Sequence, residues 1–259
     1  MNFIDFLPLI SAVFVFYLGL VVFWKDVRAR INFTFFLLVL AIVVWLFGTF
    51  MMFVYGENKG SAIFWDRFVY SGVIFIPVFM YHFNLAYSGR KRNKILVAGY
   101  ILSFLFLFLN GTEYFVDGVF HYQWGVHTKA QLFHHLFLVY FFILILRWFV
   151  EMIRYYRTLK SKLARERTKY VILGFLFLFV IGFMAFLPAY GLGIYPFAYV
   201  SGVIFAIILA YAILKHKLFN LKAVLTEMSV VGFSVLLLIN LLFFSDNIFE
   251  YVPRGFQAS

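Results

Sequence analysis

Long apolar segments separated by short polar breaks dominate the chain. A helix that crosses a bilayer needs about 20 mostly apolar residues, and eight windows of the sequence meet this pattern. They are residues 3–24, 33–55, 63–87, 95–110, 131–153, 170–190, 195–214 and 229–249, of which the fourth is the shortest. The pattern predicts an all-α fold, a polytopic membrane helical bundle with a seven-helix core in residues 1–216 and an eighth helix at 229–249.

The composition of the chain also requires a membrane environment. Hydrophobic residues make up 65% of the chain and charged residues 13%, with a mean hydropathy of +0.96. Soluble domains average about 45–50% apolar and about 25% charged residues, so one soluble core cannot enclose these side chains. Cysteine is absent, which excludes disulfide scaffolds, Cys-ligated zinc, iron–sulfur clusters and thiol catalysis.

Basic residues fall in alternate loops, following the first, third, fifth and seventh windows. Seventeen of the 22 Lys and Arg residues lie there: Lys25, Arg28, Arg30, Arg90, Lys91, Arg92, Lys94, Arg154, Arg157, Lys160, Lys162, Arg165, Arg167, Lys169, Lys215, Lys217 and Lys222. Lys and Arg are retained on the cytoplasmic side of a membrane. We therefore expect a plasma-membrane protein with its N-terminus outside and its seventh helix ending inside. The net charge of +11 then reflects topology, and we expect no nucleic-acid partner.

Two connecting segments carry patterns of their own. Between the fourth and fifth windows, aromatic and β-branched residues flank Asp117-Gly118, a strong signal for a hairpin turn. We predict a β-hairpin that covers the outer mouth of the bundle, with an aromatic interface anchor as the alternative interpretation. Residues 217–228 form either a short amphipathic stretch that meets anionic lipid headgroups or a plain inner connector. Membrane lipids are thus expected partners.

The predicted third helix carries a polar and aromatic stripe. Asp66, Tyr70, Pro77, Tyr81 and Asn84 recur at three-, four- and seven-residue steps, so they share one helix face. That face should point into the bundle. Asp66 either marks a hydrated helix start, favoured by the helix dipole, or belongs to the charged rim of a ligand pocket.

An aromatic pocket open to the outside is expected where this stripe meets the later helices. Adjacent helical residues point about 100° apart, so His134 and His135 cannot easily share a metal ion. One should face the cavity and the other a neighbouring helix or the interface. We predict no metal site and no cofactor. The predicted ligand-binding residues are Asp66, Tyr70, Tyr81, His134, His135, Tyr195, Tyr199 and Asn240. The expected ligand is a small molecule, a lipid or a peptide.

Two further intramembrane features predict packing contacts. His82 lies roughly opposite the stripe, where a packing histidine is expected more often than a ligand. Arg147 and Glu151 are one helical turn apart near the inner end of the fifth window. This spacing suits an ion pair with snorkelling and indicates a structural role.

Several stretches carry a family resemblance in their order and spacing. Residues 67–72 read RFVYSG, Pro77 and the segment FNLAYSG at 83–89 follow, RERTK stands at 165–169, and AYAILKHKLFNLK stands at 210–222. Together they resemble the N-terminal seven-helix sensor region of bacterial membrane histidine kinases, over roughly residues 1–245. The resemblance implies a membrane sensor of two-component signalling that reports a cue to a cytoplasmic kinase, or sometimes to a nucleotide cyclase or phosphatase. It implies a homodimer by analogy with the kinases.

The chain also departs from that pattern. Nothing in it resembles a phosphoacceptor helix or an ATP-binding lid, and no catalytic residue carries over from the family, so this chain is expected not to be an enzyme. An eighth crossing would leave the C-terminus outside, which indicates a truncated sensor or a stand-alone relative. Residues 252–255, VPRG, resemble part of a protease-cleavage tag and favour a tag-derived tail at 250–259. A transporter is the alternative function, although internal repeats are absent and Pro and Gly breaks cluster near helix ends.

Overall fold

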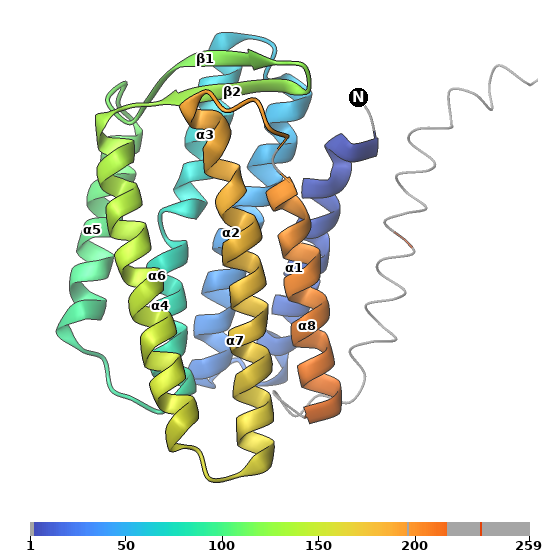
Figure 1. Ribbon diagram of the computed structural model, residues 1–259, viewed down its shortest axis with the longest axis vertical. Helices are drawn as coiled ribbons and strands as arrows, with labels where there is room; N and C mark the ends of the chain where they lie inside the picture. Colours follow the sequence, from blue (N-terminus) through green and yellow to red (C-terminus); the bar gives the residue numbers. More distant parts are fainter. Residues whose placement is uncertain (1–2, 196, 217–233, 235–259) are drawn as a thin grey trace, which may run out of the picture.

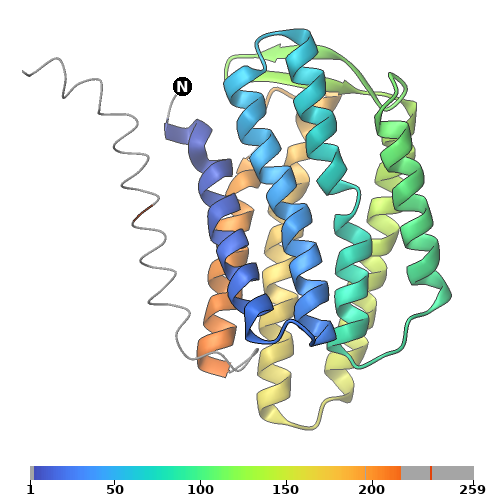
Figure 2. The same ribbon diagram turned by 180° about the vertical axis from the view of Figure 1, so that it is seen from behind.

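The described helices run along one long axis, and a two-stranded hairpin lies across one end of the bundle (Figures 1 and 2). The structure is a computed structural model that describes residues 3–195, 197–216 and 234. Its elements are, in order, η1 (Phe3–Phe6), α1 (Leu7–Lys25), α2 (Arg30–Tyr55), α3 (Lys59–Val73), α4 (Ile76–Tyr87), α5 (Lys94–Asn110), β1 (Val116–Tyr122), β2 (Gly125–Ala130), α6 (Leu132–Thr158), α7 (Lys162–Gly182), η2 (Phe183–Tyr190), η3 (Phe197–Tyr199) and α8 (Val200–His216).

Within the described part of the chain, these elements make seven apolar crossings. Five are long and apolar enough to cross a membrane: Leu7–Lys25, Arg30–Tyr55, Lys59–Tyr87, Leu132–Thr158 and Lys162–Tyr190. Two shorter apolar helices, Lys94–Asn110 and Phe197–Ile213, complete the set. They coincide with the first seven predicted windows, so the predicted membrane bundle is confirmed. The predicted connector at 217–228 and tail at 250–259 lie outside the described residues, as does the eighth helix at 229–249 except for Ser234.

The third crossing is interrupted partway along its length, between α3 and α4. Pro77 lacks the N–H group that would bond the carbonyl of Val73. The chain instead makes a tight turn, in which the N–H groups of Ile74 and Phe75 donate to the carbonyls of Tyr70 and Gly72 at 3.0 and 2.9 Å. The expectation that helix breaks cluster near helix ends is therefore wrong for this crossing. The effect of a proline on a helix depends on which groups can hydrogen-bond to the carbonyls that it leaves unpaired.

Small residues allow α2 to pack closely against its neighbours. A Cβ atom on Gly72 of α3 would lie 2.5 Å from the carbonyl oxygen of Ala41, so glycine is required for this approach. On the outer surface of the bundle, α5 and α6 expose large apolar side chains, among them Phe104, Phe108 and Ile143. Such side chains are compatible with lipid contact and would be costly in water.

The predicted hairpin is confirmed, but the predicted position of its turn is wrong. The strands pair antiparallel with Val119 opposite Thr128 and Tyr122 opposite Gly125, so the turn consists of Gln123 and Trp124. The register shifts between Val116 and Val119, and Gly118 has a φ of 71°. Asp117-Gly118 therefore forms a bulge inside β1. A bulge and a hairpin turn can both demand a glycine with positive φ, so the dipeptide alone does not distinguish them.

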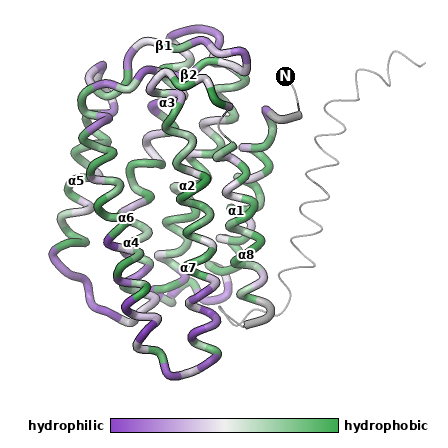
Figure 3. The backbone as a smooth tube through the Cα atoms, in the orientation of Figure 1, coloured by the Kyte–Doolittle hydropathy of each residue, from purple (hydrophilic) through white to green (hydrophobic). Residues whose placement is uncertain are grey.

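Hydrophilic residues gather at both ends of the bundle, in the hairpin and in the connections at the opposite end (Figure 3). The α1–α2, α4–α5 and α6–α7 connections all lie at the end opposite the hairpin (Figures 1 and 2). These connections and the adjoining helix turns hold most of the basic residues counted above. The alternation seen along the sequence thus corresponds to two chemically different ends of one bundle.

Candidate ligand site and the ionic cluster at the opposite end

A cavity of about 60 Å³ lies inside the bundle next to the hairpin. By volume it can hold several water molecules or a small ligand. Most of its lining is apolar or aromatic, and its polar groups belong to Thr49, Asp66, Tyr70, His127 and Tyr199. The other lining residues are Trp45, Met52, Val69, Val73, Ile76, Met80, Phe141, Ile145, Phe175, Leu178, Phe179, Gly182, Phe183, Ala185 and Phe186. We call Asp66, Tyr70 and His127 its polar end.

Asp66 lies buried beneath the hairpin, with 1% of its surface exposed. The hydroxyl of Thr128, from β2, donates a short hydrogen bond to its Oδ2 atom. The hydrated-helix-start interpretation of Asp66 is therefore wrong. Among the described residues no Lys, Arg or His nitrogen forms an ion pair with this carboxyl. His127 and Arg67 act on this carboxyl group electrostatically, but neither lies within ion-pair distance. A carboxyl group at this depth is costly and marks a candidate functional position.

His134 links three parts of the bundle through two tyrosines. Its Nε2 atom lies 2.5 Å from Tyr70 Oη, and its Nδ1 atom lies 2.9 Å from Tyr190 Oη. A neutral imidazole donates from one nitrogen and accepts at the other, so one tyrosine accepts a hydrogen bond and the other donates one. This chain of hydrogen bonds joins α3, α6 and η2 beside the cavity.

His135 and Tyr195 lie outside the cavity. His135 is exposed, and its Nδ1–H donates to the carbonyl of Gln131 at 2.6 Å. The expectation that only one of the two histidines faces inward is met, with His134 the inner one. Tyr195 stacks on Phe53 and meets the edge of Trp124 at the hairpin. Burial, with a smaller contribution from Asp5, raises the pKa of Tyr195 to about 12.

The remaining predicted ligand residues fall in three places. Tyr199 is 2% exposed and lines the cavity, and its carbonyl accepts a 2.5 Å hydrogen bond from Ser11. Tyr81 faces the bundle interior as predicted but lies away from the cavity lining, at the ionic cluster described below. Asn240 lies outside the described residues.

Sequence reasoning missed His127 and Thr128, which β2 places over Asp66. The available signal was the hairpin itself, since a strand that crosses the mouth of a bundle must turn some side chains inward. His127 and Thr128 are both buried, although successive strand residues ordinarily point to opposite faces. Thr128 bonds Asp66 and His127 lines the same cavity as Asp66, so the alternation expected of a strand does not separate them.

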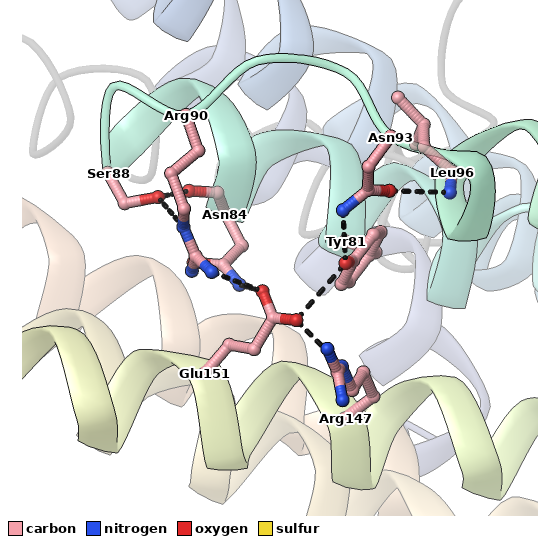
Figure 4. Close-up of polar contacts among 8 residues, drawn as sticks. All are labelled: Tyr81, Asn84, Ser88, Arg90, Asn93, Leu96, Arg147 and Glu151. Carbon is pink, nitrogen blue, oxygen red and sulfur yellow. Dashed lines mark hydrogen bonds and ion pairs between the residues drawn. The ribbon is translucent and has the colours of Figure 1, made fainter.

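A second buried carboxylate, Glu151, lies near the C-terminal end of α6, towards the end of the bundle opposite the hairpin. Figure 4 shows the polar side chains that surround it. Arg147 Nε donates to its Oε1 at 2.7 Å, and Arg90 Nη1 forms an ion pair with its Oε2 at 2.8 Å. Tyr81 Oη and Asn84 Nδ2 complete the shell at 3.1 and 3.4 Å. The glutamate side chain is 4% exposed, whereas those of Arg90 and Arg147 are 41% and 43% exposed. We call these five residues the Glu151 cluster.

The cluster joins α4, the α4–α5 connection and α6. The predicted ion pair between Arg147 and Glu151 is confirmed, while the contributions of Arg90, Tyr81 and Asn84 were not anticipated. Asn93 extends the cluster, because its Nδ2 donates to Tyr81 Oη at 3.0 Å while its Oδ1 accepts from the N–H of Leu96 in the first turn of α5. One network therefore positions the start of α5 and couples it to α6.

His82 packs between α4 and α5, consistent with its predicted role. Its Nδ1 atom lies 2.8 Å from Tyr100 Oη, and the residue is 6% exposed. Its Nε2 atom is buried without a hydrogen-bond partner. Within the described part of the chain, no group of three or more His, Asp or Glu residues has a geometry suited to a metal ion.

The described crossings, packed around a cavity with one polar end, define a polytopic helical membrane protein. Comparison with protein families identifies the family of this membrane protein: residues 7–222 match the family described as the N-terminal 7TM region of histidine kinase. The chain belongs to this family. A search of curated proteins found no match. The family is that of the membrane sensor regions of histidine kinases, distinct from their catalytic domains.

Proposed function

We propose that this chain detects an extracellular or membrane-borne ligand and relays a conformational change to the inner side of the membrane. The observation that carries the proposal is the cavity, which touches α2, α3, α4, α6 and α7 together and has a buried carboxyl group under the hairpin. A ligand there contacts most of the bundle at once. A ligand can shift the balance between two helix packings only if it binds one of them better.

The proposed route of the signal follows the third crossing. Met80 of α4 lines the cavity, and its neighbour Tyr81 donates to Glu151. A displacement of α4 by a ligand would therefore strain the Glu151 cluster directly. That cluster holds the start of α5 and the inner half of α6, so the change would reach the basic end of the bundle. Discrete repacking of this kind is a common switching mode in helical proteins.

The proposed orientation has the N-terminus and hairpin outside and the basic end inside, following the positive-inside rule. The chain contains no cysteine, so single-cysteine variants report topology without background. Gln123→Cys at the hairpin turn and Lys91→Cys in the α4–α5 connection are matched, since both residues are exposed. An impermeant maleimide added to intact cells should label the Gln123→Cys variant and leave the Lys91→Cys variant unlabelled. The opposite labelling pattern would show that the topology is inverted and would refute the proposal.

Signalling can be measured in a fusion. Residues 1–222, joined to a histidine kinase domain through a native-length linker, should change the rate of autophosphorylation when challenged with lipids, peptides or pH steps. Tyr70→Phe removes the hydroxyl that meets His134 and should shift the dose response. Tyr114→Phe is the matched control because Tyr114 is 62% exposed. Equal responses from both variants would exclude the cavity as the sensing site.

The proposal includes a homodimer, which the analogy with kinases favours and which cross-linking in native membranes would test. A transporter is the second candidate, and the interruption between α3 and α4 favours it, because transporters bind substrates at broken helices near the midplane. Ion-coupled solute uptake into proteoliposomes would support that function. A kinase response without any uptake would support the sensor.

A further inference from the structure

The polar end of the cavity presents hydrogen-bond acceptors with no cation in direct contact among the described residues, and His127 and Arg67 act on Asp66 only from beyond ion-pair distance. Asp66 receives its hydrogen bond from a neutral hydroxyl and has no ion-pair partner among the described residues. The Glu151 cluster is different, because each oxygen of Glu151 meets an arginine. Buried charges are normally paired. The contrast marks Asp66 as a carboxyl group whose partner is supplied from elsewhere.

His127 adds a second acceptor beside Asp66. Its Nδ1 atom lies 3.0 Å from the carbonyl oxygen of Thr128, and a carbonyl can only accept, so Nδ1 carries a proton. In the neutral imidazole the Nε2 atom is then an acceptor. Both residues line the cavity. A ligand that donates several hydrogen bonds from a positively charged group matches this pair.

The rest of the cavity selects against most other ligands. None of its described lining residues is Lys or Arg, so an anion would meet a carboxyl group without compensation. A bare metal ion requires several oxygen ligands, whereas the described lining offers one carboxyl group. Trp45, Tyr70 and Tyr199 contribute aromatic rings, which attract organic cations through their faces. Beyond them the walls are apolar, formed by residues such as Ile145 and Leu178.

We infer that the cavity binds a small primary ammonium ion with a short apolar body. Its N–H groups donate to Asp66 and to Nε2 of His127, and its apolar body lies against the aromatic and aliphatic walls. The inference rests on the proposed function, because it names the chemical class of ligand for the same cavity.

Binding of simple amines by the purified full chain tests this directly. In lipid nanodiscs, n-alkylamines from ethylamine to hexylamine are titrated by calorimetry, with n-alcohols and n-carboxylates of equal length as isosteric probes. Amine affinity should rise with chain length until the cavity is full, and each alcohol should bind at least tenfold more weakly than its amine. Alcohols that bind as well as amines, or carboxylates that bind better, would overturn the inference.

Two variants assign the binding to the cavity. Asp66→Asn keeps the side-chain shape and removes its charge, and it should weaken amine binding at least tenfold, which corresponds to about 1.4 kcal/mol. Asp117→Asn is the control, since Asp117 is a 45% exposed carboxyl group on the hairpin that pairs with Lys59. Unchanged amine affinity in Asp66→Asn would overturn the inference.

A size variant keeps the test decisive if Asp66→Asn does not fold. Ile145→Phe narrows the apolar part of the cavity and should abolish hexylamine binding while ethylamine still binds. Equal loss or equal retention of both amines would count against the assigned site. The outcome is also separable from the proposed function. A fusion kinase that responds to another cue while no amine binds would leave the sensor intact and remove only the ammonium assignment.

Discussion

Replacing Glu151 with Gln should destabilise the bundle more than any change at an exposed acidic residue. The glutamate accepts three hydrogen bonds, from Arg147, Tyr81 and Asn84, and forms an ion pair with Arg90. Glutamine offers one oxygen for these four partners and turns its own N–H groups towards some of them. The two arginine charges then lose their shared counter-charge, although both side chains remain partly exposed.

The magnitude follows from this difference in exposure. Removing one partner of a fully buried ion pair costs about 3–5 kcal/mol. Because Arg90 and Arg147 are 41% and 43% exposed, water can partly solvate the charges left behind, and the cost falls. We expect Glu151→Gln to lower the free energy of unfolding by about 2–3 kcal/mol, since each lost bond to a charged group is worth about 1.5–3 kcal/mol before solvation is restored.

Equilibrium unfolding in mixed micelles, followed by circular dichroism, provides the assay. Glu166→Gln is the matched control, because Glu166 is 34% exposed and meets Lys169 at only 3.9 Å, so it should change stability by less than about 0.5 kcal/mol. Combining Arg147→Gln with Glu151→Gln should cost less than the sum of the single changes, as coupled residues do. A loss in Glu151→Gln no larger than in Glu166→Gln would refute the role assigned to the cluster.

Three further predictions concern packing, the hairpin and pH. Gly72→Ala should destabilise the bundle by about 1–3 kcal/mol, because its Cβ would lie 2.5 Å from the carbonyl oxygen of Ala41; thermal unfolding measures this. Tyr122→Phe removes the 2.7 Å hydrogen bond from Tyr122 Oη to the carbonyl of Pro188, and hydrogen exchange of the hairpin amides should accelerate by about 2- to 10-fold, for a bond worth about 0.5–1.5 kcal/mol. The pKa of Tyr195 is raised from 10.0 to about 12, so its contribution to stability should be complete below pH 10 and lost as the pH rises from 10 to 12. Tyr195→Phe should flatten stability over that interval, as followed by thermal unfolding at each pH.

Each of these predictions has a control. Gly60→Ala lies at the exposed first turn of α3, where an added Cβ meets only the side chain of Asn58 at 3.2 Å, and it should leave stability nearly unchanged. His121→Ala on the exposed side of β1 should leave hairpin exchange unchanged. Tyr114→Phe should keep the pH profile of the unmodified chain. Variants that behave like their controls would contradict the contacts assigned to Gly72, Tyr122 and Tyr195.

The sequence predicted the crossings well and the functional contacts poorly. Windows of apolar residues anticipated seven crossings because a bilayer imposes length and composition on each helix separately. The inward face of the third crossing was also predictable, since Asp66, Tyr70, Tyr81 and Asn84 are all buried. The sequence did not predict towards which end of the bundle each of these residues lies, because residues on one helix face can contact entirely different partners. Tyr81 was expected at the ligand pocket and lies instead at the Glu151 cluster.

The sequence by itself determined the membrane environment, the seven crossings, the segregation of basic residues and the hairpin. These depend on local composition and on the hydrogen-bonding needs of each segment in lipid. Only the tertiary structure decided that Thr128 bonds Asp66 and His127 lines the same cavity, that Arg90 joins Arg147 on Glu151, and that Asp117-Gly118 is a bulge. Those contacts join residues far apart in the chain, and their energies depend on burial and on the distance between partners, which no local pattern encodes.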